Sequence, residues 1–158
     1  MQFPMLARTL DFTQKYADKL QAPFALATRI YVGWVFLNSG YLKIKDWEQT
    51  ISLFESEYRV PLLSPWWGAA TGTVGELVFS ILVILGLGGR LAPLGLFAVN
   101  AMAVISYAHV LLTDDGIFGL RQHQFWGFML AMLTIYGMGN WTLDSFIQSL
   151  SKRKQGAL

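Results

Sequence analysis

The side chain most suited to chemistry is Glu76, because it stands alone in an apolar part of the chain. Residues 66–90 hold about 23 largely apolar residues, with Trp66 and Trp67 at one end and Arg90 at the other. At about 1.5 Å of rise per residue, a helix here crosses a hydrocarbon layer of about 30 Å and places Glu76 near its middle. Ionisable groups at that depth face other helices and mark a site. The alternative is a protonated Glu76 that bonds a neighbouring helix only for assembly.

Two cations lie in the preceding apolar stretch, residues 24–43. Spacings of three and four residues place five side chains on one face of a helix, namely Arg29, Gly33, Phe36, Gly40 and Lys43. Small residues let neighbouring helices approach closely, so this face is predicted to contact protein. The long cationic side chains can extend toward the two membrane surfaces.

Further polar candidates are spread along the chain. Asn38 and Asn100 lie inside apolar stretches, where they could complete a site with Glu76. His109 precedes a polar turn that contains Asp115, and His123 follows it, so an antiparallel hairpin would bring the two imidazoles to similar depth. Imidazole binds copper, zinc or haem iron. A lone interfacial histidine is, however, more often a hydrogen-bonded structural residue.

Composition restricts the class of protein. Charged residues make up 14% of the 158 residues, against about 25% in an average soluble domain, which indicates a small membrane protein. The chain has no cysteine, which excludes disulfides, thiol catalysis and iron–sulfur ligation. A formal charge of +2 without a basic block gives no sign of nucleic-acid binding.

These features predict an all-α membrane protein in which a four-helix transmembrane bundle positions the candidate residues. Residues 1–22 are expected to form an amphipathic surface helix ended by Pro23, and residues 46–59 an interfacial helix between the first two spans. The remaining segments are a membrane domain over 23–146 with spans at about 24–43, 66–88, 91–112 and 123–139, and a basic tail over 147–158.

The distribution of lysine and arginine predicts the orientation of the bundle. Eight of the twelve lie in the N-terminal segment through Arg29, at Arg90 and in the tail, and four lie on the other side. By the positive-inside rule both termini are cytoplasmic. The histidines and Asp115 then lie toward the outer face.

Three motifs carry a resemblance to a known family. They are R-x3-GWVFL-x2-G-x2-K over 29–43, GE-x9-G-x3-R over 75–90, and the closing GMGNWTLD over 137–144. In this order and spacing they resemble the DoxX family, over roughly residues 24–146. The resemblance implies a four-helix integral protein of the bacterial inner membrane. The family is named after a subunit associated with a terminal quinol oxidase, and related proteins are linked to thiosulfate–quinone oxidoreduction.

Three functions are compatible with these features of the sequence. The first is a quinone- or quinol-interacting accessory component of a membrane redox system, with Glu76 and Asn100 meeting the head group and Arg29 or Lys43 lending positive charge. The second is copper or haem handling or transport through His109 and His123. The third is a non-catalytic assembly subunit. The expected partners are the lipid bilayer, a membrane redox protein and further copies of the chain.

Overall fold

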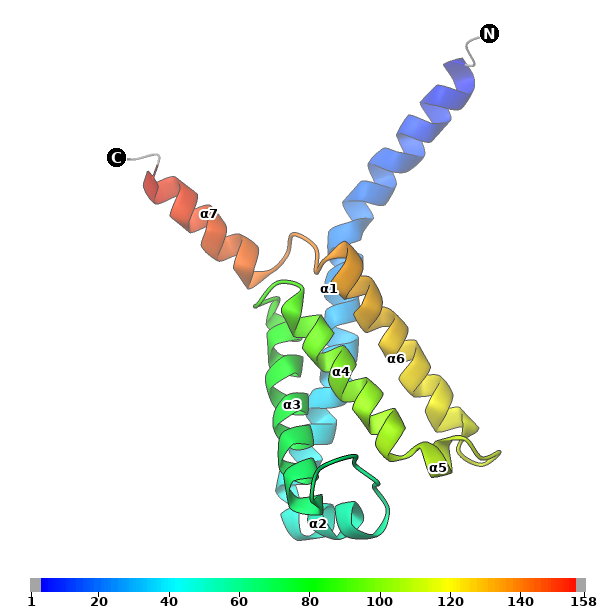
Figure 1. Cartoon of the computed structure of the whole chain (residues 1–158). Coiled ribbons are helices and arrows are strands. Elements are labelled where there is room, and N and C mark those ends of the chain that lie inside the picture. The colour runs from blue at the N-terminus through cyan, green and yellow to red at the C-terminus, as the bar shows by residue number, and fades with distance from the viewer. Residues whose placement is uncertain (1–3, 156–158) are drawn as a thin grey trace.

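All regular secondary structure of the computed structural model, which describes residues 4–155, is helical. Its seven helices are α1 (Pro4–Lys45), α2 (Trp47–Ser56), α3 (Pro65–Leu85), α4 (Leu91–Ser106), α5 (Ala108–Leu111), α6 (Ile117–Tyr136) and α7 (Leu143–Gln155), and this part of the chain contains no strand (Figure 1). The predicted all-α class is confirmed.

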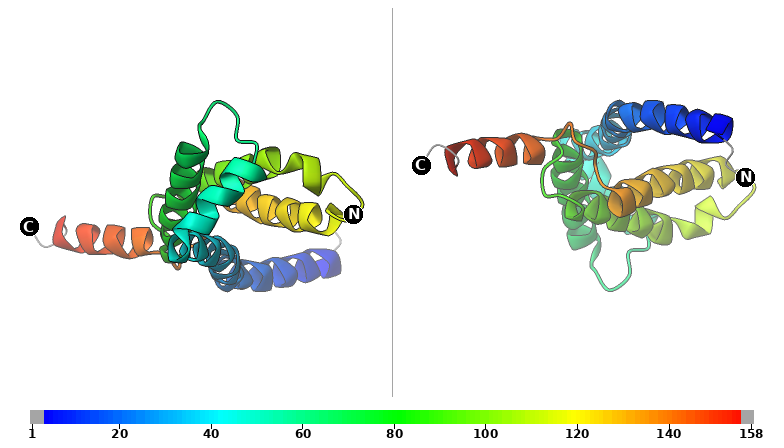
Figure 2. Two further views of the ribbon diagram at one scale, coloured as in Figure 1. Left: turned by 90° about the horizontal axis from the view of Figure 1, so that it is seen from below. Right: turned by 90° about the horizontal axis from the view of Figure 1, so that it is seen from above.

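Four helices pack together to form the body of the molecule. They are α3, α4, α6 and the part of α1 that follows Pro23, while α2 lies across one end of this bundle (Figures 1 and 2). Their common core is apolar and consists of Val32, Phe36, Val83, Ala92, Leu96, Leu130 and Leu133. The face predicted on the first apolar stretch does contact protein, since Arg29, Gly33, Phe36 and Gly40 are all buried.

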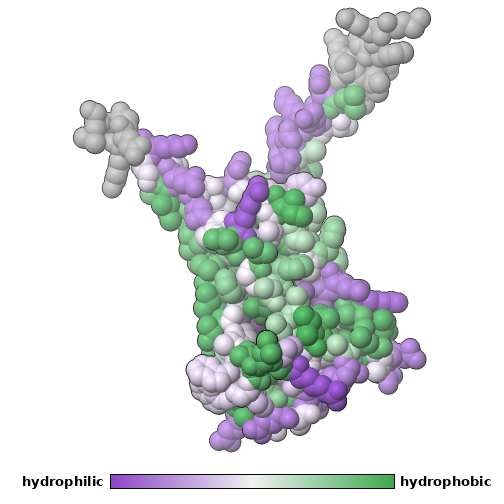
Figure 3. Space-filling view, viewed as in Figure 1, coloured by the Kyte–Doolittle hydropathy of each residue, from purple (hydrophilic) through white to green (hydrophobic). Residues whose placement is uncertain are grey.

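The surface of the bundle is suited to lipid. Large apolar side chains are exposed around the body, among them Trp34, Val78, Phe128 and Ile135. Figure 3 shows this apolar surface over the middle of the body, with hydrophilic residues at its lower end and on the projecting helices. By length and composition, the helices over Leu10–Lys45 and Pro65–Leu85 can each cross a membrane, and α4 is a shorter apolar helix.

The first helix differs from the prediction. A separate helix ending at Pro23 was expected, but α1 runs unbroken through this residue. An internal proline removes one backbone hydrogen bond and bends a helix without having to end it. Figure 1 shows the N-terminal part of α1 leaving the bundle at an angle, and residues 10–21 are exposed throughout. Residues 1–3 of the expected surface helix lie outside the described residues.

The other element boundaries also shift. The predicted third span, 91–112, is divided at Tyr107 into α4 and α5, and α6 begins at Ile117, six residues before the expected start. The tail expected over 147–158 belongs largely to a helix, α7, which begins at Leu143 and projects from the bundle (Figure 2). Residues 156–158 lie outside the described part.

Local signals explain where the central helices begin and end. The Asp46 carboxylate accepts a hydrogen bond from the Gln49 backbone N–H at 3.0 Å, which caps α2 as its sequence predicts. Pro65 occupies the first turn of α3, where the missing N–H costs nothing. Gly86 ends α3 with a φ of 68°, a left-handed conformation that favours glycine.

Candidate functional site

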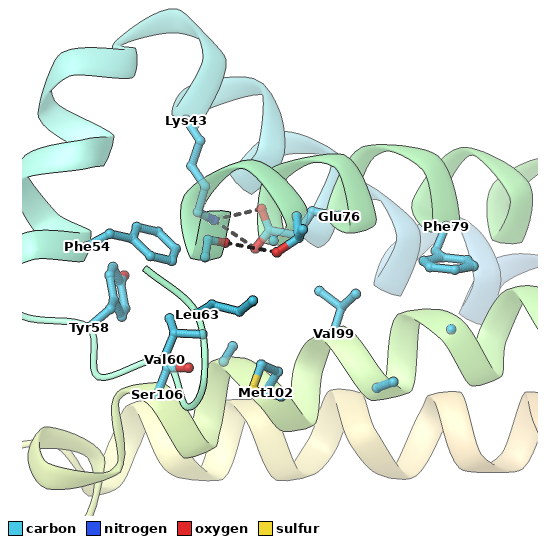
Figure 4. Close-up of a pocket in the computed structure, with 16 residues that line it drawn as sticks. Lys43, Phe54, Tyr58, Val60, Leu63, Glu76, Phe79, Val99, Met102 and Ser106 are labelled. Atoms are coloured by element: carbon cyan, nitrogen blue, oxygen red, sulfur yellow. Dashed lines mark hydrogen bonds and ion pairs between the residues drawn. The ribbon is translucent and has the colours of Figure 1, made fainter. Parts of the chain in front are cut away.

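An ion pair between α1 and α3 lies at the centre of the candidate site. The Lys43 ammonium donates to both carboxylate oxygens of Glu76, with Nζ to Oε1 and Nζ to Oε2 distances of 2.7 Å (Figure 4). Ser39 completes the group, because its Oγ lies 2.8 Å from Lys43 Nζ and 3.4 Å from Glu76 Oε1. Glu76 is 7% exposed, so the prediction that its side chain faces other helices is confirmed.

Glycines on both sides of Glu76 allow the helices to approach this closely. A Cβ atom at Gly40 of α1 would lie 2.9 Å from Leu77 Cγ, and one at Gly75 would lie 2.8 Å from Val99 Cγ2 of α4. These distances are shorter than van der Waals contact. Without a side chain at either position, α1 and α4 both reach the turn of α3 that carries Glu76.

A cavity of about 380 Å³ opens beside the ion pair. Its walls come from α2, α3, α4, the connection that follows α2 and the end of α1 that carries Lys43 (Figure 4). The lining is mostly apolar, with Phe54, Val60, Leu63, Phe79, Val99 and Met102. Besides Lys43 and Glu76, its polar side chains are those of Tyr58, Thr71 and Ser106. The cavity is therefore an apolar slot with opposite charges on one wall.

The segment after α2 covers this cavity and is attached to the end of α4. The Arg59 backbone N–H donates to the Ser106 carbonyl at 2.8 Å, and the Tyr107 hydroxyl donates to Glu57 Oε2 at 3.0 Å. The Tyr58 and Tyr107 rings lie 5.1 Å apart. Burial, followed by the charges of Tyr107, Glu76 and Glu57, raises the pKa of Tyr58. Its hydroxyl therefore stays neutral near pH 7 and can donate a hydrogen bond.

The structure brings Asn100 to His123 rather than to Glu76. The Asn100 side-chain amide donates to the His123 carbonyl at 3.0 Å, and Asn100 Oδ1 lies 2.8 Å from His123 Nδ1. The His123 ring also packs edge-on against Trp126, with centroids 5.0 Å apart. Neither Asn100 nor His123 lines the cavity. This pair connects α4 to α6.

The remaining outer-face candidates do not form a metal site with His123. His109 is exposed on α5 and packs edge-on against Tyr107, and Asp115 is exposed in the turn before α6. Over residues 4–155, no group of three or more histidine, aspartate or glutamate side chains could hold a metal ion. Asn38 is exposed on α1 and also lies outside the cavity.

Arg29 lies at the opposite end of α1 from the ion pair. It precedes Lys43 by 14 residues, which corresponds to about 21 Å along a helix. Its guanidinium Nη2 donates to the Trp141 carbonyl at 2.6 Å, in the connection between α6 and α7. The two cations of the predicted face therefore belong to separate sites.

Sequence reasoning missed part of the polar group and of the cavity. Ser39 precedes Lys43 by one helical turn, a spacing that could have revealed its contact with the ammonium. Phe54 and Tyr58 belong to the aromatic stripe of the predicted interfacial helix, but nothing in their spacing shows that they face Glu76. Ser106 and Val60 come together only through the fold.

Comparison with known protein families gives a match over more than half of the chain. A family model described as DoxX matches residues 24–109, which includes the ion pair and every wall of the cavity. Neither the curated proteins nor the solved structures include a match to the chain.

Proposed function

The chain belongs to the DoxX family of membrane proteins, and we propose that it binds a quinone or quinol in the cavity beside the Lys43–Glu76 pair. In this role it is an accessory component of a membrane redox system, to which a partner protein supplies electrons. The proposed setting is the bacterial inner membrane. There α1, α3, α4 and α6 cross the bilayer, residues 10–21 rest on its surface, and both termini are cytoplasmic.

The single observation that carries the proposal is the ion pair on the wall of an apolar cavity. A quinone head group presents two carbonyl oxygens, and its quinol form presents two hydroxyls. The Lys43 ammonium can donate to a carbonyl oxygen, and the Glu76 carboxylate can accept from a hydroxyl. At about 380 Å³ the cavity falls within the range of small-molecule sites.

The neighbouring side chains suit the rest of such a ligand. Phe54 and Tyr58 offer aromatic faces beside the head group, and the neutral Tyr58 hydroxyl can serve as a further donor. Val99 and Met102 line the apolar remainder of the cavity, where the start of an isoprenoid tail would lie. The Glu76 carboxylate could also take the proton released when a bound quinol is oxidised.

Quinone-dependent quenching of tryptophan fluorescence tests the proposal. A short-chain quinone should quench the detergent-solubilised protein saturably, and Glu76→Gln should raise the dissociation constant about tenfold, because a hydrogen bond to a charged group contributes about 1.5–3 kcal/mol. Glu55→Gln, which neutralises an exposed carboxylate on α2 outside the cavity, should leave the constant unchanged. Equal quenching of all three proteins would contradict the proposal. Size-exclusion profiles establish that each variant is folded.

A further inference from the structure

Arg29 carries a charge that the surrounding protein leaves largely unpaired. The residue is 1% exposed. A guanidinium has five N–H donors, yet the only hydrogen bond of this one, within the described residues, is from Nη2 to the Trp141 carbonyl. Nε and Nη1 have no hydrogen-bond partner. Over residues 4–155, Arg29 forms no salt bridge, and the salt bridge found there is the distant Lys43–Glu76 pair. A buried cation without an anion is costly, which suggests that a partner is supplied from outside the chain.

The nearest protein groups offset this charge only in part. The guanidinium lies against Gly86, at the carboxyl end of α3, where the helix dipole places about half a negative charge. The nearby Asp144 carboxylate is turned to the Gly89 backbone N–H, at 2.8 Å. The two free guanidinium nitrogens still lack an acceptor.

A second cavity, of about 640 Å³, adjoins Arg29 at this end of the bundle. It is open to the surface, and no acidic side chain lines it. Besides Arg29, its polar side chains are those of Asn140, Thr142, Ser145 and Ser149, and each of them has a group that can donate a hydrogen bond. The amino end of α7, a helix of 13 residues, also borders the cavity and adds a partial positive charge. The remaining wall is apolar, with Leu26, Ile84, Leu85, Trp141, Leu143 and Phe146.

We propose that this cavity binds a phosphate-bearing anion, with the phosphodiester of an anionic phospholipid head group as its source. Arg29, the hydroxyls and the amino end of α7 meet the phosphate, and the apolar wall meets the first carbons of the lipid. Nε and Nη1 are themselves buried, so the protein atoms that separate them from the cavity must move aside as the head group enters. Arginine is well matched to phosphate because its planar fork donates two parallel hydrogen bonds.

The neighbouring helix is suited to the same lipid surface. Leu143, Phe146, Ile147 and Leu150 recur at helical spacing on α7 and are all exposed. Lys152 and Arg153 follow at its end and are exposed as well. An apolar stripe ending in basic residues is typical of helices that lie in the head-group layer of an anionic membrane. Such a helix would place the mouth of the cavity where phospholipid phosphates are found.

Native mass spectrometry of the full chain in detergent micelles tests the site. Short-chain phosphatidylglycerol should bind about tenfold more tightly than phosphatidylcholine with the same chains. Arg29→Gln should abolish this preference. Arg121→Gln, which removes an exposed cation at the other end of the bundle, should retain it. Competition by inorganic phosphate identifies the source. A phosphate ion that displaces the lipid at equal concentration makes free phosphate the ligand, whereas a failure to compete supports the lipid head group.

A second pair of variants decides the question if Arg29→Gln does not fold. Ser149 lines the cavity and is exposed, so Ser149→Glu should fold and repel the anion, with about a tenfold loss of phosphatidylglycerol binding. Ser151→Glu adds the same charge to the same helix outside the cavity and should have little effect. Absence of a phosphatidylglycerol preference in the wild-type chain, or equal losses in these two variants, would overturn the proposal.

Discussion

At the level of single residues, the Lys43–Glu76 pair has opposite charges in a position with little access to water. The Lys43 side chain is 20% exposed and that of Glu76 is 9% exposed. Each charge is tolerated there because the other is within hydrogen-bond distance. The Ser39 hydroxyl contributes a further contact. The same pair then serves as a ready donor and acceptor for a ligand, because the cost of burying both groups is already met by folding.

A double-mutant cycle can measure how strongly the two charges depend on each other. Lys43→Met and Glu76→Gln should each lower the free energy of unfolding by about 3 kcal/mol, because each leaves the other group without its partner in a covered position. The double variant should lose clearly less than the sum of the two. Unfolding in mixed micelles of lipid and sodium dodecyl sulfate provides the measurement. Lys45 and Glu48 are exposed, so the substitutions Lys45→Met and Glu48→Gln provide the control. Their effects on the free energy of unfolding should be small and additive. Additive losses at Lys43 and Glu76 would argue against coupling.

The sequence singles out Glu76 and offers both Lys43 and Arg29 as its possible cation. A carboxylate in the middle of an apolar stretch is recognisable by residue type alone, and the structure confirms its inward orientation. Two roles were open for Lys43, extending toward a membrane surface or lending positive charge beside Glu76, and its ammonium contacts Glu76. That contact depends on how far α1 and α3 are shifted along each other. Residues 46–64 connect the two helices, and the helical pattern of α1 and α3 does not predict the shift between them.

At the level of helices, close contact between α1 and α3 depends on glycines. A Cβ atom at Gly33 would lie 2.5 Å from Ile84 Cγ1 and 3.2 Å from the Ser80 carbonyl oxygen. Gly72 is different, because a Cβ atom there would meet only Phe54 Cζ, at 3.9 Å. Glycines at similar spacing in two apolar helices can therefore have different roles, and their environments decide which are essential.

Alanine at Gly33 should lower the stability of the protein, whereas alanine at Gly72 should not. Gly33→Ala should lower the free energy of unfolding by about 2 kcal/mol, since Ile84 and the backbone of α3 must move to make room. Gly72→Ala should leave it unchanged or raise it by up to about 1 kcal/mol, because alanine is the better helix former. Unfolding of both variants in mixed micelles checks the difference. Equal stability of the two would show that α1 and α3 separate without cost.

The periodic pattern of the chain predicts its helices better than their ends. The apolar stretches correspond to α3, α4, α6 and the bundle part of α1, but the break at Tyr107 leaves no clear signal in the sequence. Pro23 does give a signal, but the helix end predicted there is wrong, because α1 continues through this residue. The sequence of the tail does predict a helix, since its apolar residues share one face, namely Leu143, Phe146, Ile147 and Leu150.

At the level of the whole molecule, an apolar body separates two polar ends. The ion pair and its cavity lie toward the end covered by α2, and Arg29 and the second cavity lie toward the end from which α7 projects (Figure 1). The single helix α1 carries both cations. In the proposed orientation, the first cavity would open near the outer side of the membrane and the second near the cytoplasmic side.

This orientation can be tested directly because the chain has no cysteine, so that one introduced thiol gives an unambiguous label. Leu62→Cys, in the segment after α2, and Asp114→Cys, before α6, change exposed residues on the predicted outer side. Both should react with a membrane-impermeant maleimide in intact cells. Ser151 in α7 is also exposed, but the Ser151→Cys variant should react only after the membrane is opened.

Four crossings require this pattern, because two membrane passages separate residue 62 from residue 114 and one separates residue 114 from residue 151. Labelling of residues 114 and 151 from the same side would remove α6 from the set of spans and would contradict the assignment of a cytoplasmic α7.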